Sequence, residues 1–239
     1  MTERLILVNG LPGVGKTTLA RDLGSVLDAA VISKDAIKES VADALQLGPA
    51  ESGALGGAAM EMAWTIAAAV PGTVIIDTWL FAPRDRRFAE AGIEKVAAAH
   101  TVELWCTAPV DVVRDRYRSR RRHEVHRDAD RLGRDWEMWA AAAEPLGLCP
   151  SIVVDTSTPV DVGALARDPR LEPAGDGARA PGSRQRERMA AFGHALRDAD
   201  RGYGNEFRSW DELASHAAGP IELHRREAAH PPGRTSPDS

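Results

Sequence analysis

Short apolar runs alternate along the chain with longer segments of helical periodicity. The runs occupy residues 5–8, 30–32, 74–76, 102–105 and 152–154. The spacing between them predicts helices near residues 15–27, 35–45, 54–70, 84–98, 109–121, 131–143 and 159–167, with Pro109 and Pro159 in first turns, where proline is tolerated. Buried strands that alternate with helices predict an α/β fold, a five-stranded parallel sheet between two helical layers.

This alternation ends near Asp168. Prolines, glycines and polar residues dominate residues 169–186, which predicts a flexible linker. Residues 187–239 predict a partly helical or disordered tail, in which Met189, Phe192 and Leu196 share one helical face. We therefore expect a folded domain over residues 1–168, followed by the linker and the tail.

Composition narrows the class of protein. The 239 residues are 44% hydrophobic, enough for a real core, and the net charge of −5 argues against a general nucleic-acid binder. Cys106 and Cys149 stand far apart without metal-ligand spacing, which is typical of reduced thiols. The apolar stretch at residues 54–70 contains Glu61 and is too short to cross a bilayer. We expect a cytoplasmic, soluble protein with no membrane partner.

The strongest motif follows the first apolar run. It matches the phosphate-binding pattern GxxxxGK[ST] between a strand and a helix, and its residues are Gly10, Leu11, Pro12, Gly13, Val14, Gly15, Lys16, Thr17 and Thr18. Its glycines let successive backbone N–H groups face the phosphates of a nucleoside triphosphate. Lys16 supplies a mobile positive charge, and the Thr17 hydroxyl is the expected Mg²⁺ ligand.

Asp35 comes directly after the second predicted strand. A carboxylate at this sheet edge would face the terminal phosphate, where it can orient an attacking hydroxyl and accept its proton. The alternative is an N-cap role without catalysis, because an aspartate ahead of a helix stabilises exposed N–H groups. Lys34 and Lys38 flank it and are candidate substrate-binding residues.

Asp77 ends the third predicted strand. It can hold the water shell of Mg²⁺, bind a substrate hydroxyl, or cap the next turn, and the sequence leaves the three roles open. Trp79 and Phe81 follow into the expected acceptor cleft, where they can stack on a planar substrate or simply pack. Arg84 is a further candidate for substrate binding.

A dense cationic segment spans residues 114–122. Such runs are usually solvated helix faces, but this one leads into a polar stretch that suits a cover closing over phosphates. Arginines on such a cover stabilise a transferring phosphoryl group, and the candidates are Arg118, Arg121 and Arg122. The nearby pair His123 and His126 lacks a third zinc ligand.

The last predicted strand is followed by a polar turn at residues 155–161. This turn can contact an adenine base, or it can simply cap the following helix.

Four segments together resemble the P-loop kinase-like proteins that include zeta toxins, chloramphenicol phosphotransferase and the kinase domain of polynucleotide kinase. They are residues 8–18, 32–39, 75–79 and 154–157, and they are most similar to a group of bacterial AAA-type ATP-binding proteins. The resemblance covers residues 4–167. It implies the strand order 2-3-1-4-5, ATP and Mg²⁺ as cofactors, Asp35 as the base and an arginine-rich lid within residues 118–122.

These observations favour a kinase that transfers the γ-phosphoryl group of ATP to a hydroxyl of a small molecule such as an antibiotic, nucleoside or sugar. Two alternatives stay open. A polynucleotide 5′-hydroxyl kinase would use the basic lid and Trp79 as a strand platform. A regulatory ATPase would hydrolyse ATP and act through its tail, without a phosphorylated product.

Overall fold

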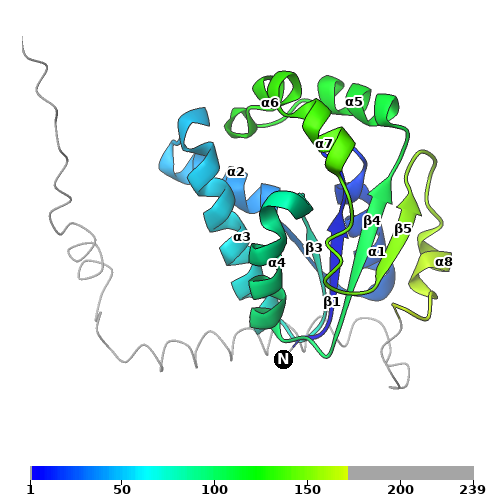
Figure 1. Cartoon of the computed structure of the whole chain (residues 1–239). Coiled ribbons are helices and arrows are strands. Elements are labelled where there is room, and N and C mark those ends of the chain that lie inside the picture. The colour runs from blue at the N-terminus through cyan, green and yellow to red at the C-terminus, as the bar shows by residue number, and fades with distance from the viewer. Residues whose placement is uncertain (1, 172–239) are drawn as a thin grey trace, which may run out of the picture. The chain divides into compact units, whose positions relative to one another are not determined.

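Five parallel strands form the centre of the protein. The structure is a computed structural model that describes residues 2–171. The strands are β1 (Thr2–Asn9), β2 (Ala30–Ser33), β3 (Gly72–Asp77), β4 (His100–Thr107) and β5 (Ser151–Asp155). Their order is β2-β3-β1-β4-β5 (Figure 1), which confirms the predicted order and the α/β P-loop fold.

Helices cover both faces of the sheet and gather at one end. The α-helices of the described chain are α1 (Lys16–Leu27), α2 (Lys34–Leu45), α3 (Ser52–Ala69), α4 (Ala82–Val96), α5 (Val110–Ser119), α6 (Asp128–Arg134), α7 (Trp136–Ala142) and α8 (Val162–Ala166). Two short 3₁₀ turns are η1 (Pro49–Glu51) and η2 (Glu124–His126). In Figure 1, α3 and α4 lie on one face of the sheet, and α1 and α8 on the other.

The central strand β1 shows why both faces are covered. Its alternating side chains point to opposite faces of the sheet, and Leu5 to Val8 are all fully buried. Ile6 and Val8 belong to the core beneath α1, whereas Leu5 and Leu7 pack in the core with α3 and α4. A strand that buries both faces reads as a continuous apolar run, which is the pattern on which the strand prediction depended.

Three predicted helices differ from the observed ones. The helix predicted at residues 109–121 ends at Ser119, because Arg120 is extended. The helix predicted at residues 131–143 is two helices, α6 and α7, separated at Asp135. The last helix begins at Val162 with Asp161 as its N-cap, so Pro159 precedes the helix and is not in its first turn. Pro109 is the N-cap residue of α5.

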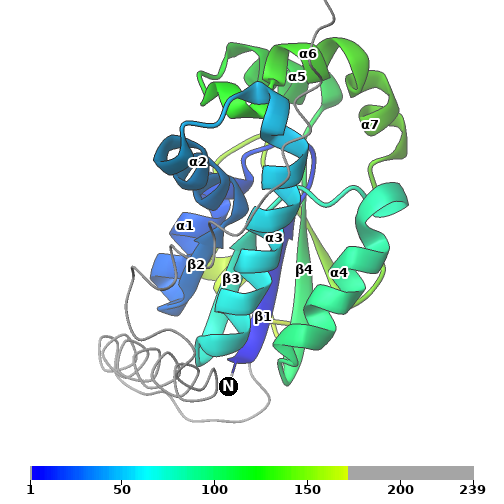
Figure 2. The ribbon, with the colours of Figure 1, turned by 90° about the vertical axis from the view of Figure 1, so that its left-hand side faces the viewer.

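The short helices α5, α6 and α7 lie together at the carboxyl ends of the strands (Figures 1 and 2). The Tyr117 ring on α5 stacks on Trp136 of α7, with 5.8 Å between ring centroids. Ligands of open parallel sheets bind outside these strand ends. The helices α5 to α7 therefore cover the region in which the sequence predicts the site.

The packed domain continues past its predicted end at residue 168. Leu171 is fully buried in the core beneath α1, and the Arg170 carbonyl lies 2.7 Å from Nε2 of His100. Leu171, which was predicted as part of the linker, is thus packed in the core, whereas Pro169 and Arg170 are exposed. The remaining linker and the predicted tail at residues 187–239 lie outside the described residues. No helix within residues 2–171 is long and apolar enough to cross a membrane.

Candidate active site

The phosphate-binding loop has the backbone that its glycines predict. Gly10, Gly13 and Gly15 have φ angles of 136°, 91° and 108°, in the left-handed region that side chains rarely adopt. A Cβ at Gly10 would lie 2.5 Å from the Cys106 carbonyl oxygen, so the loop also approaches β4 too closely for alanine. The loop therefore requires glycine for two independent reasons.

Lys16 is the first residue of α1 and is buried within the loop. Its ammonium donates hydrogen bonds to the carbonyl oxygens of Gly10, at 2.8 Å, and Leu11, at 3.0 Å. Burial lowers the pKa of the Lys16 ammonium to about 8, although the Asp77 carboxylate partly offsets this effect. The loop thus holds a desolvated cation of the kind that binds phosphate oxygens.

Asp77 accepts hydrogen bonds from hydroxyl groups on two other elements. Its Oδ2 lies 2.7 Å from Oγ1 of Thr17 and 3.3 Å from Oγ of Ser33. Burial raises the pKa of Asp77, although Lys16 and the Thr17 hydrogen bond oppose the shift. These oxygen atoms fit a hard cation such as Mg²⁺, which keeps several waters and takes few protein ligands.

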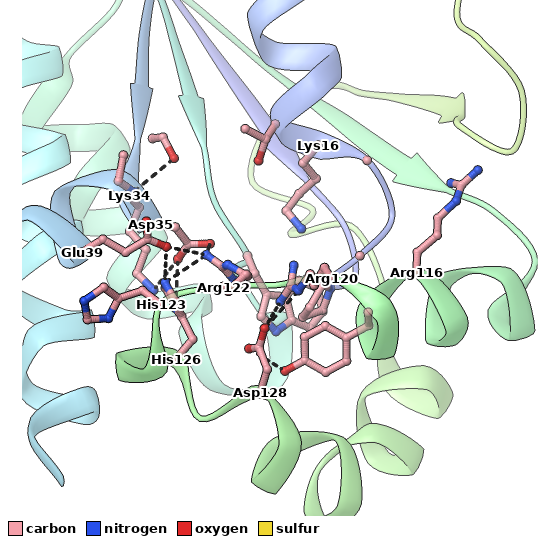
Figure 3. A pocket seen from close by; sticks show the side chains of 18 of the residues that line it. Lys16, Lys34, Asp35, Glu39, Arg116, Arg120, Arg122, His123, His126 and Asp128 are labelled. Carbon is pink, nitrogen blue, oxygen red and sulfur yellow. Dashed lines mark hydrogen bonds and ion pairs between the residues drawn. The ribbon is translucent and has the colours of Figure 1, made fainter. Parts of the chain in front are cut away.

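A cavity of about 710 Å³ extends from this loop to the lid (Figure 3). Lys16 and Thr17 line it on one side. Asp35 and Glu39 of α2 line another side. The segment from α5 to α7 (residues 110–142), which we call the lid, contributes Arg116, Arg120, Arg121, Arg122, His126 and Arg131. The structure therefore brings Asp35, Lys16 and two of the three predicted lid arginines, Arg121 and Arg122, to one cavity.

Asp35 lies in the first turn of α2. Ser33, not Asp35, is the N-cap, because the Ser33 hydroxyl accepts the Ala36 N–H. The Asp35 Oδ2 lies 2.7 Å from Nη2 of Arg122, and Oδ1 lies 3.5 Å from Nζ of Lys34. Burial raises the pKa of Asp35, but the charges of Lys34 and Arg122 outweigh it and hold the pKa well below its usual range.

Three acids on one face of α2 contact the lid. Asp35, Glu39 and Asp43 follow one another at four-residue spacing. The Glu39 Oε1 lies 2.6 Å from Nε2 of His126, and the Asp43 Oδ1 lies 2.9 Å from Nε2 of His123. The lid is therefore tied to α2 along the helix as well as at Asp35. Glu39 was not among the predicted site residues, although its spacing from Asp35 is visible in the sequence.

His126 is buried between Glu39 and the arginine cluster. Burial, reinforced by Arg122, lowers the pKa of His126 to about 4. The ring is therefore neutral at neutral pH, and its Nε2 lies between Glu39 Oε1 and Nη2 of Arg122, which is 3.0 Å away. No group of three or more His, Cys, Asp or Glu side chains that could hold a metal ion occurs within residues 2–171.

The arginines in and directly after α5 fall into two sets. Arg116 of α5 and Arg120, which follows the helix, line the cavity near the buried Tyr117. Arg120 lies 4.3 Å above the Tyr117 ring and 2.9 Å from Asp128. Arg118 faces solvent and pairs with Asp115 at 3.3 Å, so its predicted position at the site is wrong. Arg116 and Arg120 lie there instead, and neither was among the predicted site residues.

The turn after β5 braces the phosphate-binding loop. The Thr156 hydroxyl donates to the Val14 carbonyl at 2.6 Å, and Arg116 donates to the Thr156 and Ser157 carbonyls. A cavity of about 490 Å³ lies between this turn and Gly15 of the loop. Its position beside the loop fits the nucleobase of a bound nucleotide, while Asp161 caps α8 by accepting the Ala164 N–H.

Four of the predicted substrate residues, but not Asp77, line a second cavity of about 610 Å³. Lys34, Lys38, Trp79 and Arg84 all contribute to it, and Lys34 and Trp79 also line the first cavity. Trp79 packs against three aromatic neighbours as well, with 6.2 Å to the Trp139 ring. Phe81 is buried in the core and lines neither cavity.

The fold and the loop define a P-loop nucleotide-binding protein. A family model described as an AAA domain matches residues 5–146, and the chain belongs to this family. A comparison with curated protein sequences gives no match.

The chain is similar to several solved structures. A candidate kinase from Chloroflexus aurantiacus is 26% identical with a TM-score of 0.57, and the match covers 69% of this chain and 95% of that one. A shikimate kinase from Bacteroides thetaiotaomicron is 19% identical with a TM-score of 0.45, covering 68% and 96%. A gluconokinase from Sinorhizobium meliloti is 16% identical with a TM-score of 0.43, covering 86% and 98%.

Proposed function

We propose that the protein is an ATP-dependent phosphotransferase that moves the γ-phosphoryl group to a hydroxyl of a small molecule of the antibiotic, nucleoside or sugar type. The proposal depends above all on one observation. The Asp35 carboxylate, the Lys16 ammonium and the Arg122 guanidinium line the same cavity. A hydroxyl acceptor, a phosphate and a charge-stabilising group have to meet in this way for phosphoryl transfer. The likeness to the candidate kinase supports the same class of reaction.

The side chains have distinct roles in this proposal. Lys16 and the loop N–H groups hold the phosphates, and Arg120 and Arg122 neutralise charge on the transferred group. Thr17 and Asp77 would hold Mg²⁺ through oxygen atoms and water, and the bound ion would supply further neutralisation of phosphate charge. Asp35 accepts a hydrogen bond from the acceptor hydroxyl, and 36% of its side chain is accessible for this contact.

The step balances without a further reactant. A bond forms between the acceptor oxygen and the γ-phosphorus, while the bond from that phosphorus to the β–γ bridging oxygen breaks and ADP leaves. The hydroxyl proton passes to Asp35 and then to water. Because bond breaking is advanced in such loose transition states, a carboxylate of low pKa can orient the hydroxyl and take its proton late.

A transfer assay tests the proposal. The full chain is incubated with γ-labelled ATP, Mg²⁺ and separate pools of aminoglycosides, nucleosides, neutral sugars, acidic sugars and 5′-hydroxyl oligonucleotides. We expect label on a small molecule, and no label on any compound with Lys16→Met. Label on oligonucleotides alone would indicate an end kinase, and label in inorganic phosphate alone would indicate an ATPase. Either outcome would contradict the proposal.

A further inference from the structure

The second cavity is bounded by α3 and α4 and meets the first beside Asp35. Lys34, Trp79 and Arg131 line both cavities. A molecule in the second cavity can therefore extend a hydroxyl toward Asp35 while the rest of it stays outside the nucleotide site. Gly53 and Gly57 of α3 leave space here, since a Cβ at either position would meet nothing within 4 Å.

The walls of this cavity carry an excess of positive charge. The charged residues are the cations Lys34, Lys38, Arg84, Lys95 and Arg131 and the acids Glu61 and Asp85. Both acids are already paired: Arg84 forms two bonds of 2.7 Å with Asp85, and Lys95 pairs with Glu61.

Two of the cations have no carboxylate partner within residues 2–171. Lys38 is 1% exposed, and its ammonium donates to the Ser52 hydroxyl at 2.7 Å and the Val125 carbonyl at 3.2 Å, both uncharged groups. Arg131 of α6 forms no ion pair in this part of the chain. A buried ammonium without a counter-charge is costly, and an anion beside it would offset that cost.

Apolar side chains complete the lining. Trp64, Trp79, Met60 and Phe88 contribute to it, and Phe88 is 71% exposed on α4. Exposed aromatic surface beside a cavity is available to contact the carbon skeleton of a ligand. The cavity thus combines an apolar wall with a cationic wall, on which Lys38 and Arg131 have no carboxylate partner within residues 2–171.

We infer that this cavity binds the phosphoryl acceptor through an anionic group, a carboxylate or a phosphate monoester, held by Lys38 and Arg131. The inference rests on the proposed phosphotransferase function, because only a phosphotransferase has a phosphoryl acceptor. Binding of an anion in this cavity can nevertheless be tested without any transfer. We expect the second cavity to select anionic hydroxyl compounds. Neutral sugars lack the charge that Lys38 and Arg131 would bind, and cationic aminoglycosides would be repelled by the same two residues.

Binding of matched probes tests the site directly. With the nucleotide site saturated by ADP and Mg²⁺, fluorine NMR follows 4-fluorobenzoate, 4-fluorophenyl phosphate and neutral 4-fluorobenzamide. We expect one of the two anions to bind about tenfold more tightly than the amide, because charge-assisted hydrogen bonds are the stronger ones. Whichever anion binds more tightly identifies carboxylate or phosphate as the preferred group. Equal binding of the amide, or no saturable binding of any probe, would overturn the inference.

Two arginines of α6 provide a matched pair of variants. Arg131→Gln removes a cation from the cavity wall without breaking an ion pair of the described chain, and we expect anion binding to fall about tenfold. Arg134→Gln makes the same change on the solvent side, where Arg134 pairs with Asp135, and should leave binding unchanged. Lys38→Met is a second test of the cationic wall. Anion binding that survives both Arg131→Gln and Lys38→Met would place the probe elsewhere and refute the site.

Transfer to metabolites distinguishes this inference from the proposed function. A cell-extract metabolite mixture is divided by anion exchange into an anionic fraction and a neutral and cationic fraction, and each is incubated with γ-labelled ATP. Label in the anionic fraction supports both ideas, whereas label only in the other fraction contradicts the inference and leaves the kinase proposal intact. Anion binding that depends on Arg131, without label in either fraction, contradicts the kinase proposal and leaves the site intact.

Discussion

Nη2 of Arg122 lies 2.7 Å from Oδ2 of Asp35, so an arginine of the lid is paired with the carboxylate proposed to contact the acceptor. The two residues are far apart in sequence and come from separate elements. Arg122 also lies 3.4 Å from Glu39, on the next turn of α2. One guanidinium thus links the lid to both carboxylates, and the position of the lid is coupled to the charge state of Asp35.

Asp35→Asn should abolish most transfer without loss of nucleotide. The amide cannot accept the acceptor proton and removes the charge that holds Arg122, so we expect turnover to fall by roughly 10²-fold or more. Nucleotide affinity should change by less than about threefold, since Asp35 has no proposed phosphate contact. Initial rates and a fluorescent-nucleotide titration measure the two quantities.

Asp43→Asn is the matched control for this variant. Asp43 lies two turns further along the same face of α2 and pairs with His123. Its side chain is 71% exposed and it does not line the first cavity, so we expect turnover near that of the parent. Equal losses in the two variants would show that lid attachment, and not the carboxylate at Asp35, limits the reaction.

Nucleotide affinity should fall as the pH rises through about 8. The pKa of Lys16 is lowered to about 8, and a phosphate beside it would raise that pKa again, so binding takes up a proton. Above pH 8 the affinity should approach a decrease of about tenfold per pH unit. Calorimetry at pH 7.5–9.5 in buffers of different ionisation enthalpy measures both effects. Affinity that stays constant over this range, or proton uptake that persists in Lys16→Met, would contradict this assignment.

The same group makes stability depend on pH in a defined direction. Lys16 titrates near 10.5 when unperturbed and near 8 in the folded protein. Between these values the unfolded chain binds more protons than the folded one, so this residue's contribution to the free energy of unfolding increases as the pH rises from 8 to 10.5. Below pH 8 the buried charge opposes folding.

Asp77→Asn should remove the effect of Mg²⁺ on nucleotide binding. The amide keeps an acceptor for the Thr17 hydroxyl but lacks the charge that attracts a hard cation. We expect Mg²⁺ to strengthen nucleotide binding in the parent and to have little effect in the variant, with similar affinities in EDTA. Asp111→Asn, at the exposed start of α5, serves as control. A full Mg²⁺ response in Asp77→Asn would exclude the metal role.

Two glycine-to-alanine changes beside the second cavity should have opposite effects on stability. A Cβ at Gly92 of α4 would lie 2.1 Å from the Trp64 ring of α3, so Gly92→Ala should cost roughly 1–3 kcal/mol. A Cβ at Gly57 meets nothing, and Gly57→Ala should add about 0.5–1 kcal/mol through helix propensity. Urea unfolding measures both. A Gly92→Ala protein as stable as the parent would mean that α3 and α4 are not in close contact.

The strands and the phosphate-binding loop could be predicted because their signals are local. Each strand is an apolar run, and the loop requires its glycines within a few residues of one another. The lid could not be predicted in detail, because the choice between Arg118 and Arg120 depends on where α5 ends and how it is rotated. Nothing near Ser119 in the sequence is a glycine or proline that would indicate that end.

Contacts between distant residues were also invisible in the sequence. Leu171 looks like part of a linker because its neighbours are polar, yet it fills a gap in the core. Asn9 precedes the loop and was not selected, because the partners that define its role come from β4 and from the segment after β3. A side chain of this kind is identified by its partners in space, not by its own sequence context.

Asn9 and Glu103 form a buried link that positions the start of the phosphate-binding loop. The Asn9 amide donates to Glu103 at 2.9 Å and to the Leu80 carbonyl at 3.1 Å, while its oxygen accepts the N–H groups of Gly10 and Leu80. Glu103 also accepts the Leu146 N–H at 2.9 Å. Both side chains are fully buried, and burial raises the pKa of Glu103.

Glu103→Gln should therefore destabilise the protein by about 1–3 kcal/mol. The glutamine NH₂ group would face either the Asn9 amide N–H or the Leu146 N–H, both of which are donors. Nucleotide binding should weaken as well, since Asn9 would lose the partner that fixes the amide facing Gly10. Urea unfolding and a nucleotide titration at a temperature where the variant is folded measure the two effects. Glu94→Gln, exposed on α4, should stay within about 0.5 kcal/mol of the parent. If Glu103→Gln is destabilised but binds nucleotide normally, the link supports the fold and does not position the loop.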